Sequence, residues 1–424
     1  MTTQAEHEIR RRITESGKIT FAEFMEVALY HPVDGYYTSK RIGATGDYYT
    51  SPKAHPAFGA SIAVELHAMW EALGRPSRFD AVEMGAGIGQ LARDVVDYSQ
   101  SLPGGFGDAL RYVAVDRASP ALRHSGFRRN DGGRRVTSNA LPFEGLVGCV
   151  LSNELLDAFP VHRFEIEDGA VREVYVTLTD GAFTEVLDEP STPLLAERLV
   201  PLRPSTSSGR TVEVPFGRLR AGSGRGLADG FRGEVNSGIG PWMAEVAAAL
   251  DRGFVLTIDY GYEAAELYSE KRPRGTLQTY SRHTQGADPY RDVGRQDLTA
   301  HVDFSAVVAD GEAVGLRPVA LWSQASFLRG LGLDSWMRRL RSEVQPQRER
   351  DANMMAMRDL VRPDGLGAFK VLVQEKGSGV GDPPRLSPDA SPASGLPVPL
   401  LGAGHIRLLE GRYSDAIWHR LLRR

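Results

Sequence analysis

The sequence predicts an α/β fold in which helices cover a mainly parallel sheet on both faces. Two observations predict this class. Apolar runs typical of strands alternate with helical patterns along most of the chain. In the stretch "AVEMGAGIGQLARD", from Ala81 to Asp94, the first such strand meets its helix through a turn of closely spaced glycines. Because ligands of parallel sheets bind at the carboxyl ends of the strands, this turn is the first place to look for function.

Composition excludes several classes of protein. A net charge of −4 gives no sign of a basic nucleic-acid-binding protein, so we expect no nucleic acid partner. The single cysteine, Cys149, rules out an intrachain disulfide, and no spacing of histidines and acids indicates a metal site. No segment is apolar enough to insert into a membrane, and the N-terminus lacks an apolar signal core. We therefore expect a cytoplasmic location.

The elements follow in order from the N-terminus. Two short helices are expected within residues 5–30, where Thr20 and Glu23 fit a capping box, and a loop rich in Gly, Pro and Tyr follows. A helix is expected over 56–73. Another is expected over 327–343, where Arg329 and Arg338 form a solvated face, with protein docking as the alternative role. The expected strands are 79–84, 110–116, 146–152, 253–261 and 316–322, the helices between them 88–99, 119–129, 240–250 and 302–315, and a hairpin covers 161–178.

Two segments interrupt the alternation. Residues 203–230 are rich in Ser, Gly and Arg and are typical of a low-complexity insertion. Residues 375–399 have the composition of a disordered linker. We therefore expect an N-terminal helical cap and lid loop over 1–55, a core with insertions over 56–375, and a linker and tail over 376–424.

The spacing of the glycines separates the classes of nucleotide site. A dinucleotide-binding turn requires a small third residue at position 90, where this chain has Gln90, and a P-loop requires a Gly-Lys-Ser/Thr sequence that is absent. The acid followed by G-x-G-x-G resembles class I S-adenosylmethionine methyltransferases. An acid at the end of the next strand is placed to accept hydrogen bonds from ribose hydroxyls. The cofactor is therefore expected to be S-adenosylmethionine, bound by Glu83, Gly85, Gly87, Gly89 and Asp116.

Further blocks of sequence resemble the MidA family. They are "ITFAEFMEVALYHPVDGYYTS", "GDYYTSPKAHPAFGASIAVEL", "SNELLDAFPVHRFE", "GFVLTIDYG" and "GTLQTYSRHTQGADPYRDVGRQDLTAHVDFSAV", in order between about residues 8 and 375. The resemblance implies a Rossmann-like class I methyltransferase core with a seven-stranded sheet, the N-terminal helical cap and inserted segments on the substrate side. It also implies protein arginine methylation, which is described for the mitochondrial member that assembles complex I, and a protein substrate such as a respiratory-complex subunit.

Candidate catalytic residues follow from the chemistry of that acceptor. A guanidinium is cationic and a poor nucleophile, so its site needs carboxylates that orient it and take up its proton. "SNELLDAFP" supplies Asn153, Glu154 and Asp157 after a buried strand, and Asp259 ends another. On the alternative reading, Asn153 caps a helix and the acids hold the fold. We also expect the loop after residue 30 to close as a lid and bring Gly46 and Asp47 to the cofactor.

Other functions stay open at this stage. The chain could be a non-catalytic assembly protein that keeps the nucleotide fold as a scaffold, although the intact glycines and Asp116 argue against it. It could also methylate a small molecule or a nucleic acid. An NAD-dependent enzyme is disfavoured by Gln90.

Overall fold

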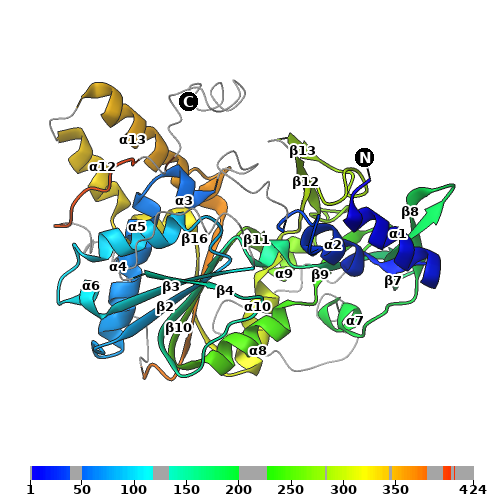
Figure 1. The fold of residues 1–424 in the computed structure, drawn as a ribbon, viewed down its shortest axis with the longest axis horizontal. Coiled ribbons are helices and arrows are strands. Elements are labelled where there is room, and N and C mark those ends of the chain that lie inside the picture. Colours follow the sequence, from blue (N-terminus) through cyan, green and yellow to red (C-terminus); the bar gives the residue numbers. More distant parts are fainter. Residues whose placement is uncertain are drawn as a thin grey trace. The chain divides into compact units, whose positions relative to one another are not determined.

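The computed structural model describes residues 2–38, 50–117, 133–199, 227–281, 284–342, 346–379, 395–402 and 405. It divides the chain into two compact units built from interleaved segments (Figure 1). Unit 1 comprises 1–47, 154–247 and 259–317, and unit 2 comprises 48–153, 248–258 and 318–424. The domain boundaries that we expected from the sequence, in which the cap, the core and the tail are successive segments of the chain, stay a prediction. Gly46, Asp47 and the helix expected over 119–129 lie outside the described residues.

Unit 2 is built around a seven-stranded, mainly parallel sheet, as expected from the sequence (Figure 1). Its strands in spatial order are β16 (Arg317–Ser323), β17 (Lys370–Lys376), β10 (Leu250–Asp259), β5 (Leu146–Asn153), β2 (Phe79–Met84), β3 (Leu110–Asp116) and β4 (Gly133–Thr137). From β2 the chain continues to β3 and β4 on one side, whereas β5 and β10 lie on the other side. The strand order therefore reverses at β2, and ligands of open α/β sheets bind beside such a reversal, at the carboxyl ends of the strands.

Helices pack on this sheet through large apolar side chains. Phe58 on α4, Phe79 on β2 and Tyr112 on β3 are fully buried in one continuous cluster, together with Trp336 on α12 and Leu360 on α13. The helices of unit 2 are α3 (Ser51–Ala54), α4 (Ala57–Ala72), α5 (Gln90–Ser99), α6 (Phe106–Ala109), α11 (Gln324–Gly330), α12 (Leu333–Ser342), α13 (Gln347–Leu360) and the 3₁₀ turn η4 (Leu366–Ala368).

Unit 1 contains a mainly antiparallel sheet and short accessory strands. β6 (Val161–Glu167) and β7 (Ala170–Thr179) form the expected hairpin, and β1 (Ile19–Thr20), β8 (Ala182–Asp188) and β9 (Arg232–Asn236) complete that sheet. Thr20 and Glu23 make the expected capping box at the start of α2. The other elements are α1 (Gln4–Ser16), α2 (Phe21–Tyr30), α7 (Leu194–Leu199), α8 (Ile239–Ala249), α9 (Ala264–Leu267), α10 (Phe304–Ala313), β11 (Gly261–Tyr262), β12 (Gln278–Ser281), β13 (Thr284–Gly286), β14 (Asp297–Thr299) and β15 (Val302–Asp303).

The structure corrects several details of the sequence interpretation. "NELLDAFP" does not form a helix; it contains one 3₁₀ turn, η2 (Leu156–Ala158). The helix expected over 327–343 is divided into α11 and α12, with Arg329 and Arg338 exposed as expected. Strands β4 and β17, which complete the sheet, were not predicted. In β4, "GRRVT" is short and two of its five residues are arginine, so it lacks the apolar run by which the other strands were recognised.

The end of the chain contributes more than a linker. Although the sequence predicts a linker up to residue 399, the carbonyl of Leu396 accepts from Arg339 on α12, and that of Pro397 accepts from Tyr98 on α5 at 2.8 Å. Further on, His405 Nε2 lies 2.9 Å from Asp94 Oδ2. Residues 395–402 and 405 are therefore packed against the helices of unit 2.

Three properties of the described residues bear on the expectations from composition. Cys149 is buried in β5, where burial raises the pKa of its thiol, so it is a core residue. Within the described ranges, no three His, Cys, Asp or Glu side chains are grouped as a metal site would require. None of the helices in this part of the chain combines the length and apolarity of a membrane span.

Candidate active site

The glycine turn follows β2 directly and has an unusual backbone. Gly85, Gly87 and Gly89 all have positive φ angles, of 73°, 52° and 71°. This left-handed region is open to glycine and strained for most other residues, which explains why three glycines occur within five positions. It also delays the start of α5 to Gln90, two residues later than the sequence predicts. At Gly87 an added Cβ would meet no protein atom within 4 Å, so the turn leaves open space beside its backbone.

Asp116, the last residue of β3, joins this turn. Its Oδ2 accepts a hydrogen bond from the Gly87 N–H at 2.6 Å, which fixes the turn against the neighbouring strand. Burial raises the pKa of the Asp116 carboxyl to about 6, and the Gly87 N–H opposes that shift. A carboxylate offers about four lone-pair positions, so the bond to Gly87 leaves acceptor capacity for two hydroxyl groups.

Glu83 lies below the turn and faces the core. Its carboxyl is 3% exposed, and its Oε2 accepts a hydrogen bond from Tyr112 at 2.9 Å. Burial raises the pKa of Glu83 to about 8. Glu83 thus supports the turn from the core side, whereas Gly85 is exposed, Gly87 and Asp116 are half-buried, and Gly89 is buried where α5 begins.

These features fit the adenosyl cofactor expected from the sequence. No side chain caps α5, so the N–H groups of its first turn point out of the helix beyond Gly89. The open space at Gly87 allows a ligand to approach the backbone, and Asp116 offers the acceptor that ribose hydroxyls require. Both lie at the strand reversal, where the topology places a ligand.

A second group of polar residues follows β5, centred on Asp259. This carboxyl, 1% exposed at the end of β10, accepts on Oδ2 from the N–H groups of Leu155, Leu156 and Asp157 at 3.2, 3.0 and 3.3 Å. Its Oδ1 accepts from Tyr260 N–H at 2.9 Å. Burial and the neighbouring Asp157 and Glu154 carboxyls raise the pKa of Asp259. Asp259 therefore holds the turn after β5, the capping role that the sequence offered as an alternative for Asn153.

Asn153 and Glu154 stand where β5 passes into this turn. Asn153 is the last residue of β5 and pairs with Ile258 of β10. Glu154 is half-buried and has a φ of 53°, which is uncommon for a residue other than glycine. Strained backbone of this kind concentrates at functional sites, because the surrounding structure must hold it in place.

The two carboxyl oxygens of Asp157 differ in their surroundings. Its Oδ2 accepts a hydrogen bond from the Tyr260 hydroxyl, whereas its Oδ1 is buried and has no hydrogen-bond partner among the described residues. Burial raises the pKa of Asp157 to about 6, and the bond from Tyr260 limits the rise. With this pKa the carboxyl is mostly ionised at neutral pH and takes up a proton more readily than an ordinary aspartate, as a residue that exchanges a proton requires.

The comparisons with known proteins decide the family. Residues 61–321, more than half of the chain, match the family described as "Putative S-adenosyl-L-methionine-dependent methyltransferase". The chain belongs to this family. A protein of Burkholderia thailandensis, solved with S-adenosyl-homocysteine bound, is similar in fold, with a TM-score of 0.74 and 27% identity over 89% of this chain and 93% of that one. This chain is thus a methyltransferase with S-adenosylmethionine as its cofactor, as the glycine turn predicted.

Two curated relatives have more specific names. The methyltransferase is 27% identical to "Protein arginine methyltransferase NDUFAF7, mitochondrial" of Danio rerio, over 79% of this chain and 78% of that protein. It is 25% identical to the Homo sapiens protein of the same name, over 84% and 79% of the two chains. Both names place those proteins in mitochondria. The cytoplasmic location that we expected from the sequence is therefore contradicted.

Sequence reasoning did not foresee which rings surround Tyr260, the partner of Asp157 in the methyltransferase. The ring of His301 lies 5.2 Å from that of Tyr260 and 5.3 Å from that of Tyr262. Burial and Arg272 lower the pKa of His301 to about 4, so its ring is neutral at physiological pH. The sequence shows Tyr260 beside Asp259 and His301 within "QDLTAHVDFS", but it does not show that their rings meet, because His301 lies between the unpredicted strands β14 and β15. Asp303 in β15 caps α10.

Proposed function

We propose that this methyltransferase transfers a methyl group to arginine side chains of a protein. The observation that carries the proposal is Asp157, a buried carboxyl on the same turn as Glu154. Its pKa is raised to about 6, and it accepts a hydrogen bond from the Tyr260 hydroxyl. The names of the curated relatives, which are protein arginine methyltransferases, support the same acceptor. A respiratory-complex subunit as the protein substrate stays a prediction.

The cofactor residues have separate tasks in this proposal. Asp116 receives the ribose hydroxyls, and the backbone of Gly85, Gly87 and Gly89 provides the close approach. Glu83 supports the turn through its bond with Tyr112. S-adenosylmethionine, when bound, supplies the methyl group on its sulfonium, so that an S–CH₃ bond breaks as an N–CH₃ bond forms.

The carboxyls after β5 orient the acceptor guanidinium and take up its proton. Glu154 orients the guanidinium, because a carboxylate pairs with the planar fork through two hydrogen bonds. The guanidinium must lose one N–H proton during the transfer. With a pKa of about 6, Asp157 is mostly ionised at pH 7 and takes up that proton. Asp259 positions Asp157 and the turn that follows Glu154 through backbone N–H groups, and Asn153 offers its side-chain amide at the strand end.

The test follows a labelled methyl group. The purified protein is incubated with methyl-labelled S-adenosylmethionine and an extract of cells that lack the enzyme, and the labelled proteins are hydrolysed to amino acids. We expect the label in methylarginine. Glu154→Gln and Asp157→Asn should each lower the rate by about 10²–10⁴-fold, the usual contribution of a positioned acid or base. Their affinity for the cofactor should stay within about threefold of the wild type, since the cofactor contacts are unchanged.

A matched control distinguishes the loss of a catalytic carboxyl from a change in the net charge of the protein. Glu270→Gln removes one exposed carboxyl from the same unit and should leave the rate unchanged. Label in another amino acid or in a small molecule would contradict the arginine acceptor. Full activity of Asp157→Asn would contradict the role of this carboxyl.

A further inference from the structure

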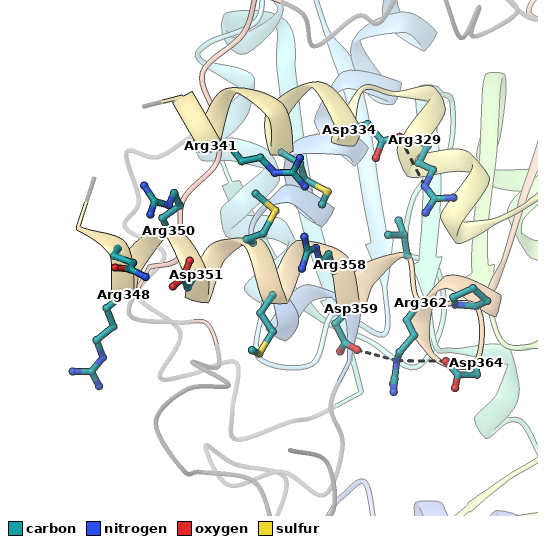
Figure 2. A pocket seen from close by; sticks show the side chains of 16 residues that line it. Arg329, Asp334, Arg341, Arg348, Arg350, Asp351, Arg358, Asp359, Arg362 and Asp364 are labelled. Carbon is teal, nitrogen blue, oxygen red and sulfur yellow. Dashed lines mark ion pairs between the residues drawn. The ribbon is translucent and has the colours of Figure 1, made fainter. Parts of the chain in front are cut away.

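A groove rich in arginine lies between α12 and α13, within unit 2 (Figure 2). The groove has a volume of about 1430 Å³ and is lined by six arginines and four aspartates. The opposite faces of the two helices pack into the core through Trp336, Leu340, Met357 and Leu360. The groove is thus the outward side of a helix pair that the fold already holds firmly.

The charges of the groove do not cancel. Arg329 lies 3.9 Å from Asp334, and Arg362 lies 3.0 Å from Asp359 and 3.9 Å from Asp364. Those contacts occupy two arginines and three aspartates. The remaining arginines, Arg341, Arg348, Arg350 and Arg358, make no ion pair with any residue that the structure describes, and only Asp351 is left to oppose them. The groove therefore has an excess of positive charge.

The side chains that carry this excess face one another. In Figure 2, Arg341 projects from α12 and Arg358 from α13 into the space between the helices. Like charges placed together repel, and an anionic partner removes that repulsion. Methionines 337, 354 and 355 also line the groove. Their flexible, polarizable side chains adapt to apolar groups of different shape.

From these observations we infer that the groove binds an acidic, partly apolar peptide segment of a partner protein. Arginine forks recognise carboxylates one at a time, and the methionines accommodate the apolar residues between them. The interleaved aspartates argue against a membrane surface or a nucleic acid, because a continuous anionic surface would meet Asp334, Asp351 and Asp364 as well. The inference does not depend on the arginine acceptor proposed above.

The test selects peptides without assuming their sequence. A library of random 16-residue peptides displayed on phage is selected on the wild-type protein, and peptides that also bind the double variant Arg341→Glu/Arg358→Glu are removed. The expected result is enrichment of Asp and Glu interspersed with apolar residues. A synthetic, fluorescently labelled peptide of the enriched sequence should then lose at least tenfold in affinity for the double variant in fluorescence anisotropy.

The control is Arg338→Glu, which reverses an exposed charge on α12 outside the groove lining. It should change the affinity less than twofold. Unchanged thermal melting and unchanged binding of S-adenosylmethionine would show that the variants are folded. Enrichment of neutral or basic peptides, no enrichment at all, or an equal loss in Arg338→Glu would overturn the proposal. So would stronger binding of anionic vesicles or RNA than of the peptide, if Arg341→Glu/Arg358→Glu abolishes it.

Discussion

Replacing Asp116 by asparagine should weaken cofactor binding selectively and remove its pH dependence. The carboxylate accepts from the Gly87 N–H at 2.6 Å and has capacity left for the ribose hydroxyls. Asparagine keeps one acceptor oxygen and replaces the other by a donor. At least one hydrogen bond to a charged group is therefore lost, which is worth about 1.5–3 kcal/mol and corresponds to about a 10- to 150-fold increase in Kd.

The pH dependence of the affinity for the cofactor gives a second, independent test of Asp116. The pKa of Asp116 is raised to about 6, and the hydroxyls of the cofactor bind its ionised form. The affinity of the wild type should be constant above pH 7 and should fall about tenfold per pH unit once the carboxyl is protonated, below about pH 6. Asp116→Asn has no such group, so its affinity should change only as far as the ligand itself titrates.

The assay is isothermal calorimetry with S-adenosylmethionine between pH 5 and pH 8. The control is Asp108→Asn, which neutralises an exposed carboxyl on α6 in the same unit and should bind as the wild type does. A loss of less than threefold in Asp116→Asn, or the same pH profile in both proteins, would refute the assignment of Asp116 to the cofactor.

Three further predictions concern the carboxyls of Asp259, Glu154 and Glu83. Asp259→Ala leaves the N–H groups of Leu155, Leu156 and Asp157 without their acceptor. The free energy of unfolding should therefore fall by about 2–4 kcal/mol in urea denaturation, and turnover should be lost. A fall below about 0.5 kcal/mol would contradict the positioning role of Asp259. Glu154→Gly relieves the positive φ of 53° and should raise the free energy of unfolding by about 1 kcal/mol while abolishing methyl transfer; an active variant would show that only the backbone matters. Glu83 has its pKa raised from 4.5 to about 8, so the unfolded chain loses this proton first and the wild type becomes less stable as the pH rises between those values. Glu83→Gln should therefore stabilise the protein by ~2 kcal/mol or more at pH 8 and hardly at all at pH 4.5, and equal effects at both pH values would contradict the buried, protonated state.

The cofactor half of the site was predictable because its signal is local. Gly85, Gly87 and Gly89 must be adjacent in sequence to form one turn, and Asp116 is fixed by the next strand, which pairs with β2 in parallel register. The carboxyl half was only partly predictable. Asn153, Glu154 and Asp157 follow a strand, but the role of Asp259 depends on backbone N–H groups about a hundred positions away in the sequence.

Other features could not be predicted for similar reasons. His301 approaches Tyr260 through short strands of two or three residues, which carry no recognisable period. The positive φ of Glu154 has no sequence signal, since the position is occupied by a residue that disfavours it. The mitochondrial names of the relatives contradicted a location that was inferred from missing signals, namely a membrane segment and an apolar N-terminal core.

Calorimetric titration of the folded protein with S-adenosylmethionine tests the central claim most directly, with NAD as the control ligand and Gly87→Val as the control variant. The added side chain meets no protein atom within 4 Å of its Cβ, but a φ of 52° is strained for valine, so thermal melting first establishes that the variant is folded. We expect micromolar binding of S-adenosylmethionine by the wild type, none by Gly87→Val, and no heat with NAD. A folded wild type that does not bind S-adenosylmethionine, or a variant that binds it equally well, would contradict the placement of the cofactor on this turn.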